Sequence, residues 1–99
     1  MPKFNVSKPA QSDMRDIALY TLEKWGADQA IRYARDMQGT FRTLAQNPGM
    51  GRACDAISSG LRRHEQGKHV VFYRLKPEGI RIVRILPQQM FPAKSHFEQ

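Results

Sequence analysis

Residues 60–86 constrain the fold of this chain most, because they read as three strands joined by short turns. The strand segments are rich in Val, Ile, Phe and Tyr, and they lie at about Leu61–Glu65, His69–Leu75 and Ile80–Leu86. The turn-forming sequences between them are Gln66-Gly67-Lys68 and Lys76-Pro77-Glu78-Gly79. β-branched and aromatic residues favour strands, and connections this short join antiparallel neighbours. The segment therefore predicts an antiparallel three-stranded meander.

A short strand and a helix are expected at the N-terminus. Phe4-Asn5-Val6 alternates apolar and polar residues, Ser7 can cap a helix, and Pro9 is tolerated in its first turn. The apolar face of this helix has helical spacing and consists of Met14, Ile17, Ala18, Leu22 and Trp25. We therefore expect Trp25 in the core, and Gly26 is suited to end the helix.

A second helix is expected from Asp28, a suitable N-cap, to Asn47-Pro48, which stops it. Its apolar face consists of Ala30, Ala34, Met37, Phe41 and Leu44. Residues 46–60 show no periodicity and predict a loop. The predicted fold is α+β, in the order strand-helix-helix-three-strand, with a helical hairpin packed on a mainly antiparallel sheet. Residues 1–99 form a single domain in this interpretation.

The positive charge is concentrated in the second half of the chain. The formal net charge is +7, and Lys plus Arg against Asp plus Glu gives 7 to 5 in residues 1–50 and 9 to 4 in residues 51–99. Residues 60–86 alone carry seven Lys or Arg and only two acids, Glu65 and Glu78. A field of this sign favours an acidic protein or a nucleic acid as partner.

Catalytic and metal chemistry find little support in the sequence. Cys54 is the only cysteine, and the histidines that could activate it, His64, His69 and His96, are distant along the chain. These residues show no zinc-binding spacing, and no phosphate-binding glycine loop is present, so we expect no metal and no cofactor. No apolar run is long enough for a signal peptide or a membrane helix, which predicts a cytoplasmic protein without a membrane partner.

Two groups of residues are candidates for partner binding. The first comprises cations of the predicted strands, Arg62, Arg63, His69, Arg74, Arg81 and Arg84. They could equally pair with acids of the helices or lie in solvent. Tyr73 is expected to pack in the sheet rather than to stack on a base. Because both faces of the last strand are partly apolar, we expect the second face to be covered by a partner or by the C-terminal tail.

The second group lies in that tail. Met90 and Phe91 are costly to leave in water, so we expect them to fold back on the sheet or to contact the partner. Residues after Lys94 are expected to be mobile until a partner binds.

Several separated motifs, in the right order from about Asp13 to Met90, resemble the ParE toxins of bacterial type II toxin–antitoxin modules, within the RelE/ParE superfamily. The N-terminal motifs are Asp16-Ile17, Tyr20-Thr21, Trp25-Gly26, Ala30 with Tyr33, and Leu44-Ala45-Gln46-Asn47-Pro48 leading to Gly51-Arg52. The C-terminal motifs are Gly60-Leu61-Arg62-Arg63, Gly67-Lys68-His69, Val71-Phe72-Tyr73-Arg74 and Ile82-Val83-Arg84-Ile85-Leu86. The strand-helix-helix-three-strand fold of that family agrees with the periodicity.

The resemblance implies a toxin that inhibits DNA gyrase by stabilising its cleaved complex with DNA, and that catalyses nothing itself. It also implies a ParD-like antitoxin whose acidic, flexible segment folds across the toxin in a hetero-oligomeric complex. Where relatives often continue Leu-His-Gln-Arg-Met-Asp, this chain has Leu86-Pro87-Gln88-Gln89-Met90-Phe91, and so lacks the His and Arg of that tail.

The alternative is a RelE-like, ribosome-dependent mRNA endonuclease. Such an enzyme needs a proton-transfer residue beside cations that stabilise the phosphorane. The C-terminal position that would supply it holds Pro87-Gln88-Gln89, although His64 or His69 could substitute. A simple DNA-binding module is disfavoured because no helix-turn-helix pattern is present.

Overall fold

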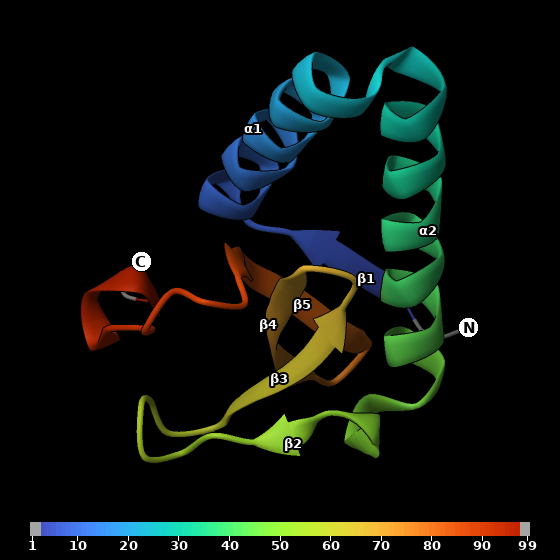
Figure 1. The fold of residues 1–99 in the computed structure, drawn as a ribbon. Helices are drawn as coiled ribbons and strands as arrows, with labels where there is room; N and C mark the ends of the chain where they lie inside the picture. The colour runs from blue at the N-terminus through green and yellow to red at the C-terminus, as the bar shows by residue number, and fades with distance from the viewer. Residues whose placement is uncertain (1–2, 98–99) are drawn as a thin grey trace.

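The computed structural model describes residues 3–97, which form two layers, a helical hairpin over one face of a sheet (Figure 1). The elements in chain order are β1 (Lys3–Val6), α1 (Lys8–Trp25), α2 (Ala27–Gln46), the 3-10 turn η1 (Pro48–Met50), β2 (Arg52–Ala53), β3 (Leu61–Gln66), β4 (His69–Lys76), β5 (Gly79–Pro87) and the 3-10 turn η2 (Lys94–Phe97). The predicted α+β fold is confirmed. No helix within residues 3–97 combines the length and the apolar character needed to cross a membrane.

The five strands form one sheet in the order β1-β5-β4-β3-β2. β3, β4 and β5 form the predicted meander, and β1 joins its edge parallel to β5, with Phe4 opposite Ile80. The two-residue strand β2, which pairs Arg52 with Arg63, lies in the segment expected to be a loop. A strand of two residues is too short to show the alternation of apolar and polar residues by which strands are predicted. The prediction of a loop was therefore wrong for residues 52–53.

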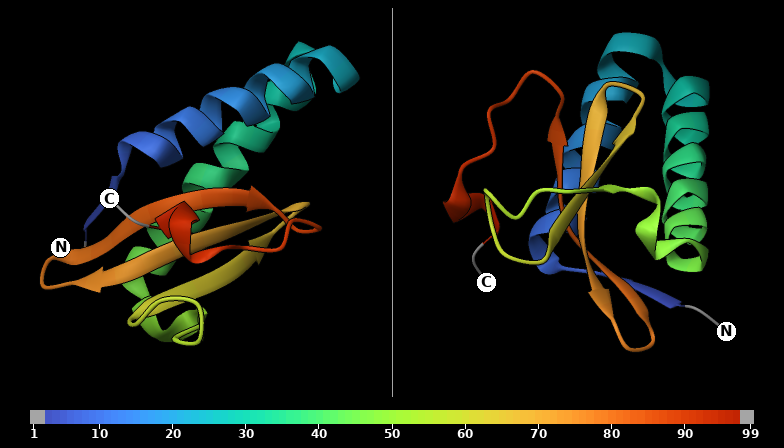
Figure 2. Two further views of the ribbon diagram at one scale, coloured as in Figure 1. Left: turned by 90° about the vertical axis from the view of Figure 1, so that its left-hand side faces the viewer. Right: turned by 90° about the horizontal axis from the view of Figure 1, so that it is seen from below.

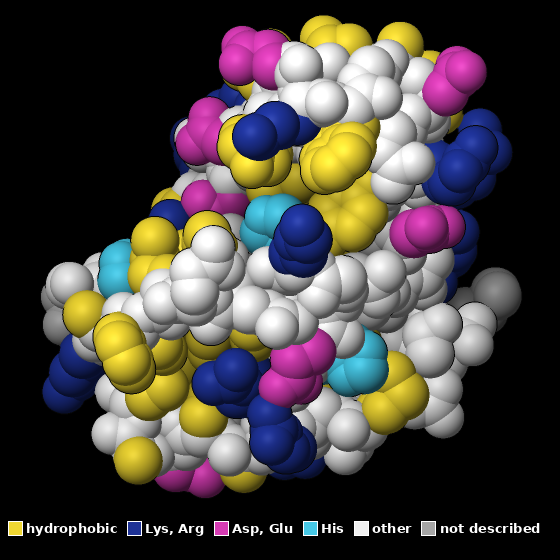
Figure 3. All heavy atoms as spheres, viewed as in Figure 1, with side chains coloured by type: hydrophobic (Ala, Val, Ile, Leu, Met, Phe, Trp, Pro, Cys, Tyr) yellow, Lys and Arg dark blue, Asp and Glu magenta, His cyan; other side chains and the backbone are white. Residues whose placement is uncertain are grey.

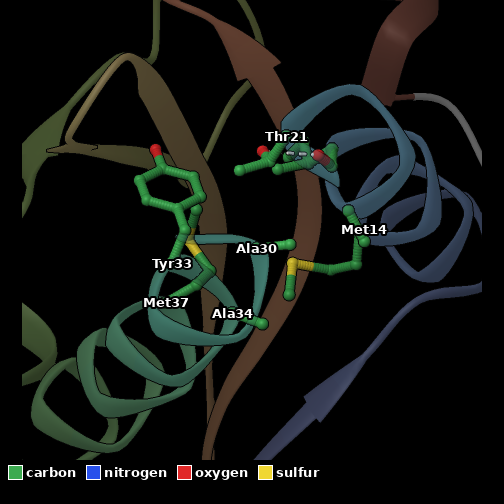
Figure 4. A pocket seen from close by; sticks show the side chains of 8 residues that line it. Met14, Thr21, Ala30, Tyr33, Ala34 and Met37 are labelled. Atoms are coloured by element: carbon green, nitrogen blue, oxygen red, sulfur yellow. Dashed lines mark hydrogen bonds between the residues drawn. The ribbon is translucent and has the colours of Figure 1, made fainter. Parts of the chain in front are cut away.

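The main core lies between the helices and the sheet. Met37, Phe41 and Leu44 of α2 are buried there against apolar side chains of β4 and β5. The predicted inner face of the second helix is therefore confirmed. Between the two helices, Figure 4 shows Met14, Thr21, Ala30, Tyr33, Ala34 and Met37 around a space of only about 10 Å³. A space of that size holds at most about one water molecule, so this junction is packing and not a ligand site.

A second, smaller core covers the opposite face of the sheet. Its buried members are Leu61, Val70, Phe72, Val83, Leu86 and Phe97. The Phe97 ring lies 4.8 Å from the Phe72 ring, centroid to centroid, and carries the C-terminal tail back across the sheet (Figure 2). The expectation that the second face is covered by the tail is confirmed.

The ends of the helical hairpin differ from the prediction. Gly26 joins α1 to α2 and has a φ of +90°, a conformation that favours glycine. Because Gly26 directly precedes α2, the predicted cap Asp28 lies inside the helix. Leu22 and Trp25 were expected in the core, but they are 47% and 62% exposed. The reason is that the tip of the hairpin extends beyond the sheet, so the last turn of α1 has no layer beneath it (Figures 1 and 2).

The C-terminal tail also corrects the prediction. Phe91 is 94% exposed and Met90 is 42% exposed, so burial against the sheet, one of the two expected positions, is wrong, and contact with a partner stays a prediction. Residues after Lys94 were expected to be mobile, but residues 95–97 belong to η2 and Phe97 is buried, while residues 98–99 lie outside the described part of the chain. The Met90 amide donates to the Pro87 carbonyl at 3.1 Å in a turn that directs residues 90 and 91 outward.

Candidate partner-binding groove

Two hollows of about 510 and 540 Å³ lie side by side between the helices and the sheet, and we call them together the groove. They share Tyr20, Lys68 and His69, so the β3–β4 turn forms the middle of the groove. The first hollow continues along α1, the end of β5 and the tail, past Ile17, Leu86 and Met90. The second continues to the helical tip, past Trp25, Gln29 and Tyr33.

The rim of the groove is aromatic and exposed. Tyr20 is 58% exposed and Trp25 is 62% exposed, and both come from the side of α1 that overhangs the sheet. In Figure 3, hydrophobic side chains gather on the upper half of this face beside a histidine and a basic side chain. Side chains with this much apolar surface cost free energy in water, so the rim is a candidate contact surface for another molecule.

The floor of the groove is a polar cluster between α2 and the β3–β4 turn. The Tyr33 hydroxyl oxygen lies 2.8 Å from the Gln66 carbonyl oxygen and 2.8 Å from His69 Nδ1. Burial raises the pKa of Tyr33 and lowers the pKa of His69, so it favours the neutral form of both side chains. Glycine is required beneath Tyr33: a Cβ on Gly67, whose φ is +58°, would lie 2.7 Å from the hydroxyl.

One wall of the groove is held by an ion pair. Arg84 donates to both carboxylate oxygens of Asp13 at 2.8 and 2.9 Å, and to the His96 carbonyl at 3.2 Å. Asp13 also accepts the Ile85 amide at 2.9 Å, at the edge of β5 beyond the end of β1. The hydrogen bond to Asp13 raises the pKa of Arg84. The Asp13 carboxylate thus connects α1 to the edge of the sheet. The hydrogen bond from Arg84 to the His96 carbonyl connects the C-terminal tail to the same wall.

The other candidate arginines contact groups within the fold: Arg62 and Arg74 contact loop segments, and Arg63 and Arg81 contact residues of neighbouring strands. Arg74 donates to the Ser59 carbonyl at 2.6 Å, and Arg81 donates to the Asn5 side chain at 2.8 Å. Arg62 donates to backbone carbonyls of residues 49 and 51, and the Arg63 guanidinium lies 5.6 Å from the centre of the Phe72 ring. The cations therefore meet carbonyl oxygens and an aromatic ring more often than acids.

The structure brings together only part of the predicted set. His69, Arg84 and Met90 line the groove, whereas Arg62, Arg63, Arg74 and Arg81 lie outside it. Phe91 is exposed next to Met90 in the tail. Sequence reasoning missed the role of Tyr20, Trp25, Tyr33 and Lys68 in the groove. Trp25, an aromatic residue at helical spacing, was expected in the core. Whether such a side chain is buried or lines a groove depends on how far the helix extends past the sheet.

Two further predictions concern side chains away from the groove. Tyr73 is fully buried, donates to the Pro48 carbonyl at 2.7 Å and accepts the Gly51 amide at 2.9 Å, which confirms that it packs within the fold. Cys54 packs at the margin of the second core, and burial raises the pKa of its thiol despite the neighbouring Arg63. Burial thus works against the thiolate that a nucleophile requires.

Comparison with known proteins identifies the family. The family described as "ParE toxin of type II toxin-antitoxin system, parDE" matches residues 4–91. The chain is 41% identical over 98 residues to "Toxin ParE1" of Caulobacter vibrioides, covering 97% of this chain and 98% of that protein. It is 42% identical over 89 residues to "Toxin ParE1" of Mycobacterium tuberculosis strain H37Rv, covering 89% and 91%.

A solved structure has the same fold. It is described as "Chromosomal ParDE TA system from P. aeruginosa", and it superposes with a TM-score of 0.74 at 23% identity, covering 88% of this chain and 96% of that one. The order of elements, the sheet and the sequence matches agree. This chain belongs to the ParE toxin family of type II toxin–antitoxin systems.

Proposed function

We propose that this toxin inhibits DNA gyrase without catalysing a reaction itself, and that a ParD-like antitoxin neutralises it by binding along the groove in a hetero-oligomeric complex. Similarity to proteins named Toxin ParE1 over nearly the whole chain supports the first part. The solved structure described as a ParDE system supports an antitoxin as partner.

The groove is the observation that carries the antitoxin assignment. Its rim presents Tyr20 and Trp25 to solvent, its far end is flanked by Met90, and Lys68 lies at its centre. A helix or extended segment with apolar anchors fits such a groove, and acidic residues on that segment would meet Lys68 and the net charge of +7. Phe91 of the tail, exposed beside Met90, is a further contact in this proposal.

The state of the cations supports inhibition by binding over mRNA cleavage. Cleavage would need a cation free to stabilise the phosphorane next to a residue that transfers a proton. Arg84 lines the groove and could be considered for stabilising the phosphorane, but its Nε and Nη2 groups both donate to the Asp13 carboxylate. Arg84 is also the only arginine among the described residues that line the two hollows with His69, so His69 has no free guanidinium beside it. Arg62, Arg63, Arg74 and Arg81 all contact groups within the fold, so direct partner contacts are secondary for them in this proposal.

Induced expression in bacterial cells tests the proposed function. The expected result is arrest of DNA replication with double-strand breaks and induction of the DNA-damage response, and growth should be rescued by co-expression of the antitoxin encoded beside this chain's gene. Arrest with an intact chromosome and mRNA cut at ribosomes would instead support the endonuclease alternative. The same readouts in cells whose gyrase is resistant to the toxin would provide the control.

Tyr20→Ala should weaken antitoxin binding by about 2 kcal/mol, because exposed aromatic side chains in a groove are typical binding hot spots. Leu19→Ala is the matched control: Leu19 is 58% exposed, as is Tyr20, but it does not line the groove. Isothermal titration calorimetry with the purified antitoxin gives both affinities. Equal losses in the two variants would place the antitoxin on another face of α1.

A further inference from the structure

The polar cluster on the groove floor fixes the tautomer of His69. The Gln66 carbonyl can only accept a hydrogen bond, so the single Tyr33 hydroxyl proton is donated to it over 2.8 Å. The Tyr33 oxygen then accepts from His69 Nδ1, also at 2.8 Å. With the Tyr33 proton assigned to the Gln66 carbonyl, the 2.8 Å contact is a hydrogen bond only if the neutral imidazole carries its proton on Nδ1. Nε2 therefore holds a lone pair.

The Nε2 atom of His69, which makes no hydrogen bond to residues 3–97, is part of the groove. His69 lines both hollows, its side chain is half-buried, and no residue among 3–97 hydrogen-bonds Nε2. The Tyr33 ring packs beside the imidazole, with the two ring centroids 5.6 Å apart, and Gly67 leaves room for that Tyr33 ring. The ring is thus oriented before any partner arrives, and such preorganisation reduces the entropic cost of a contact made through Nε2.

The charges around His69 determine what Nε2 can meet. The ionisable groups facing the same hollows are Asp13, Asp16 and Tyr20 from α1, Tyr33 from α2, Lys68 from the β3–β4 turn, and Arg84 from β5. Asp13 and Arg84 neutralise each other. Asp16 is exposed, and its charge is screened by solvent. Lys68 is exposed as well and precedes His69 in the chain, so a carboxylate bound at Nε2 would also lie near this ammonium group.

We propose that His69 is a specificity-determining contact for a carboxylate of the antitoxin, and that forming the complex takes up one proton on Nε2. The inference rests on the proposed function, in which a ParD-like antitoxin occupies the groove. A protonated Nε2 donates to the carboxylate, while Nδ1 keeps its hydrogen bond to Tyr33.

The direction of the pH dependence follows from this arrangement. In the free chain, burial lowers the pKa of His69, with Asp13 opposing the shift weakly. A partner carboxylate at Nε2 would raise the pKa in the complex. Affinity is then constant above the pKa of the complex, rises as the pH falls below it, and levels off below the pKa of the free chain. The total gain is roughly tenfold for each unit between the two pKa values.

Nuclear magnetic resonance of the free chain tests the preset tautomer. The expected imidazole nitrogen shifts are those of a protonated Nδ1 and an unprotonated Nε2 at pH 7.5. Tyr33→Phe removes the acceptor and should shift the population toward the tautomer protonated on Nε2. A predominant Nε2–H form in the parent chain, or no change in the Tyr33 variant, would overturn the inference.

The proton uptake is tested with the full-length antitoxin encoded beside this chain's gene. Calorimetry in buffers of different ionisation enthalpy should show close to one proton taken up between pH 6 and 7, and tighter binding at pH 6 than at pH 8. His69→Gln should abolish most of both effects. His64→Gln is the matched control, since His64 lies on β3 outside the groove, and it should retain them.

The outcomes separate this inference from the proposed function. Tight binding with no proton uptake, or with uptake that survives in His69→Gln, overturns the role of His69 and leaves the antitoxin assignment intact; a hydroxyl or amide donor from the antitoxin to Nε2 would give this result. No binding at any pH overturns both.

Discussion

Asp13→Ala should lower the free energy of unfolding by about 3 kcal/mol, because the substitution leaves a largely buried guanidinium and a strand-edge amide without a partner. The Asp13 side chain is 11% exposed and that of Arg84 is 21% exposed, so water replaces the lost contacts poorly. The Ile85 amide loses its acceptor at the same time. For a chain of this size the melting temperature should fall by more than about 10 °C.

The control for this prediction is Asp16→Ala, three residues further along the same helix and exposed. It removes the same charge and should change the unfolding free energy by less than about 0.5 kcal/mol. Urea unfolding followed by circular dichroism measures both variants. Similar losses of unfolding free energy in the two variants would mean that overall charge, and not the Asp13 contacts between α1, β5 and the tail, determines the stability.

Phe97→Ala should lower the free energy of unfolding by about 2 kcal/mol, whereas Phe91→Ala should leave it nearly unchanged. Phe97 is 4% exposed and packs on Phe72, so its removal opens the second core to water. Phe91 is 94% exposed and loses almost no buried surface. The substitution is chemically identical at both sites, which makes each variant the control for the other.

Thermal denaturation of the free chain distinguishes the two positions. Deletion of residues 95–99 should cause at least the loss seen with Phe97→Ala, because it removes the same anchor and also the His96 carbonyl that accepts from Arg84. If Phe91→Ala is the more destabilising of the two substitutions, the arrangement of the tail described above is wrong.

The strand pattern and the helical periodicity were sufficient to predict the arrangement of elements. The runs around Val71 and Ile82 and the face containing Met37 and Phe41 are each long enough to repeat, so they identify a strand or a helix without knowledge of its neighbours. The two-residue strand β2 has no repeat, and it forms because Arg52 and Ala53 lie beside β3. Pairing of this kind depends on tertiary structure and cannot be read from local sequence.

The errors at Trp25 and Phe91 have a common physical cause. Hydrophobicity indicates that a side chain gains from burial, but the layer that could bury it must reach that far. α1 continues past the sheet, so Trp25 lies on the rim of the groove. In the tail, the turn at 87–90 directs Phe91 outward, while η2 brings Phe97 to the sheet. The groove could not be predicted from the sequence because its residues come from α1, α2, the β3–β4 turn, the start of β4, the end of β5 and the tail.

The arginines illustrate the same limit for charge. An excess of seven cations over two acids in residues 60–86 suggested a charged contact surface. Arg74 and Arg62 instead bind backbone carbonyls of nearby loops, and Arg84 binds an acid that lies 71 residues earlier in the chain. A count of charges within one sequence segment cannot include the carbonyl and carboxylate groups that only the fold brings close to these arginines.

Purified gyrase, supercoiled plasmid and the purified chain provide the most direct test of the central claim. The account predicts that the chain traps gyrase on cleaved DNA, so that denaturation with detergent yields linear plasmid with protein covalently attached, and that prior addition of the antitoxin prevents it. Translation extracts with the same amount of chain should contain intact mRNA. Unaffected gyrase together with codon-positioned cuts in ribosome-bound mRNA would contradict the account.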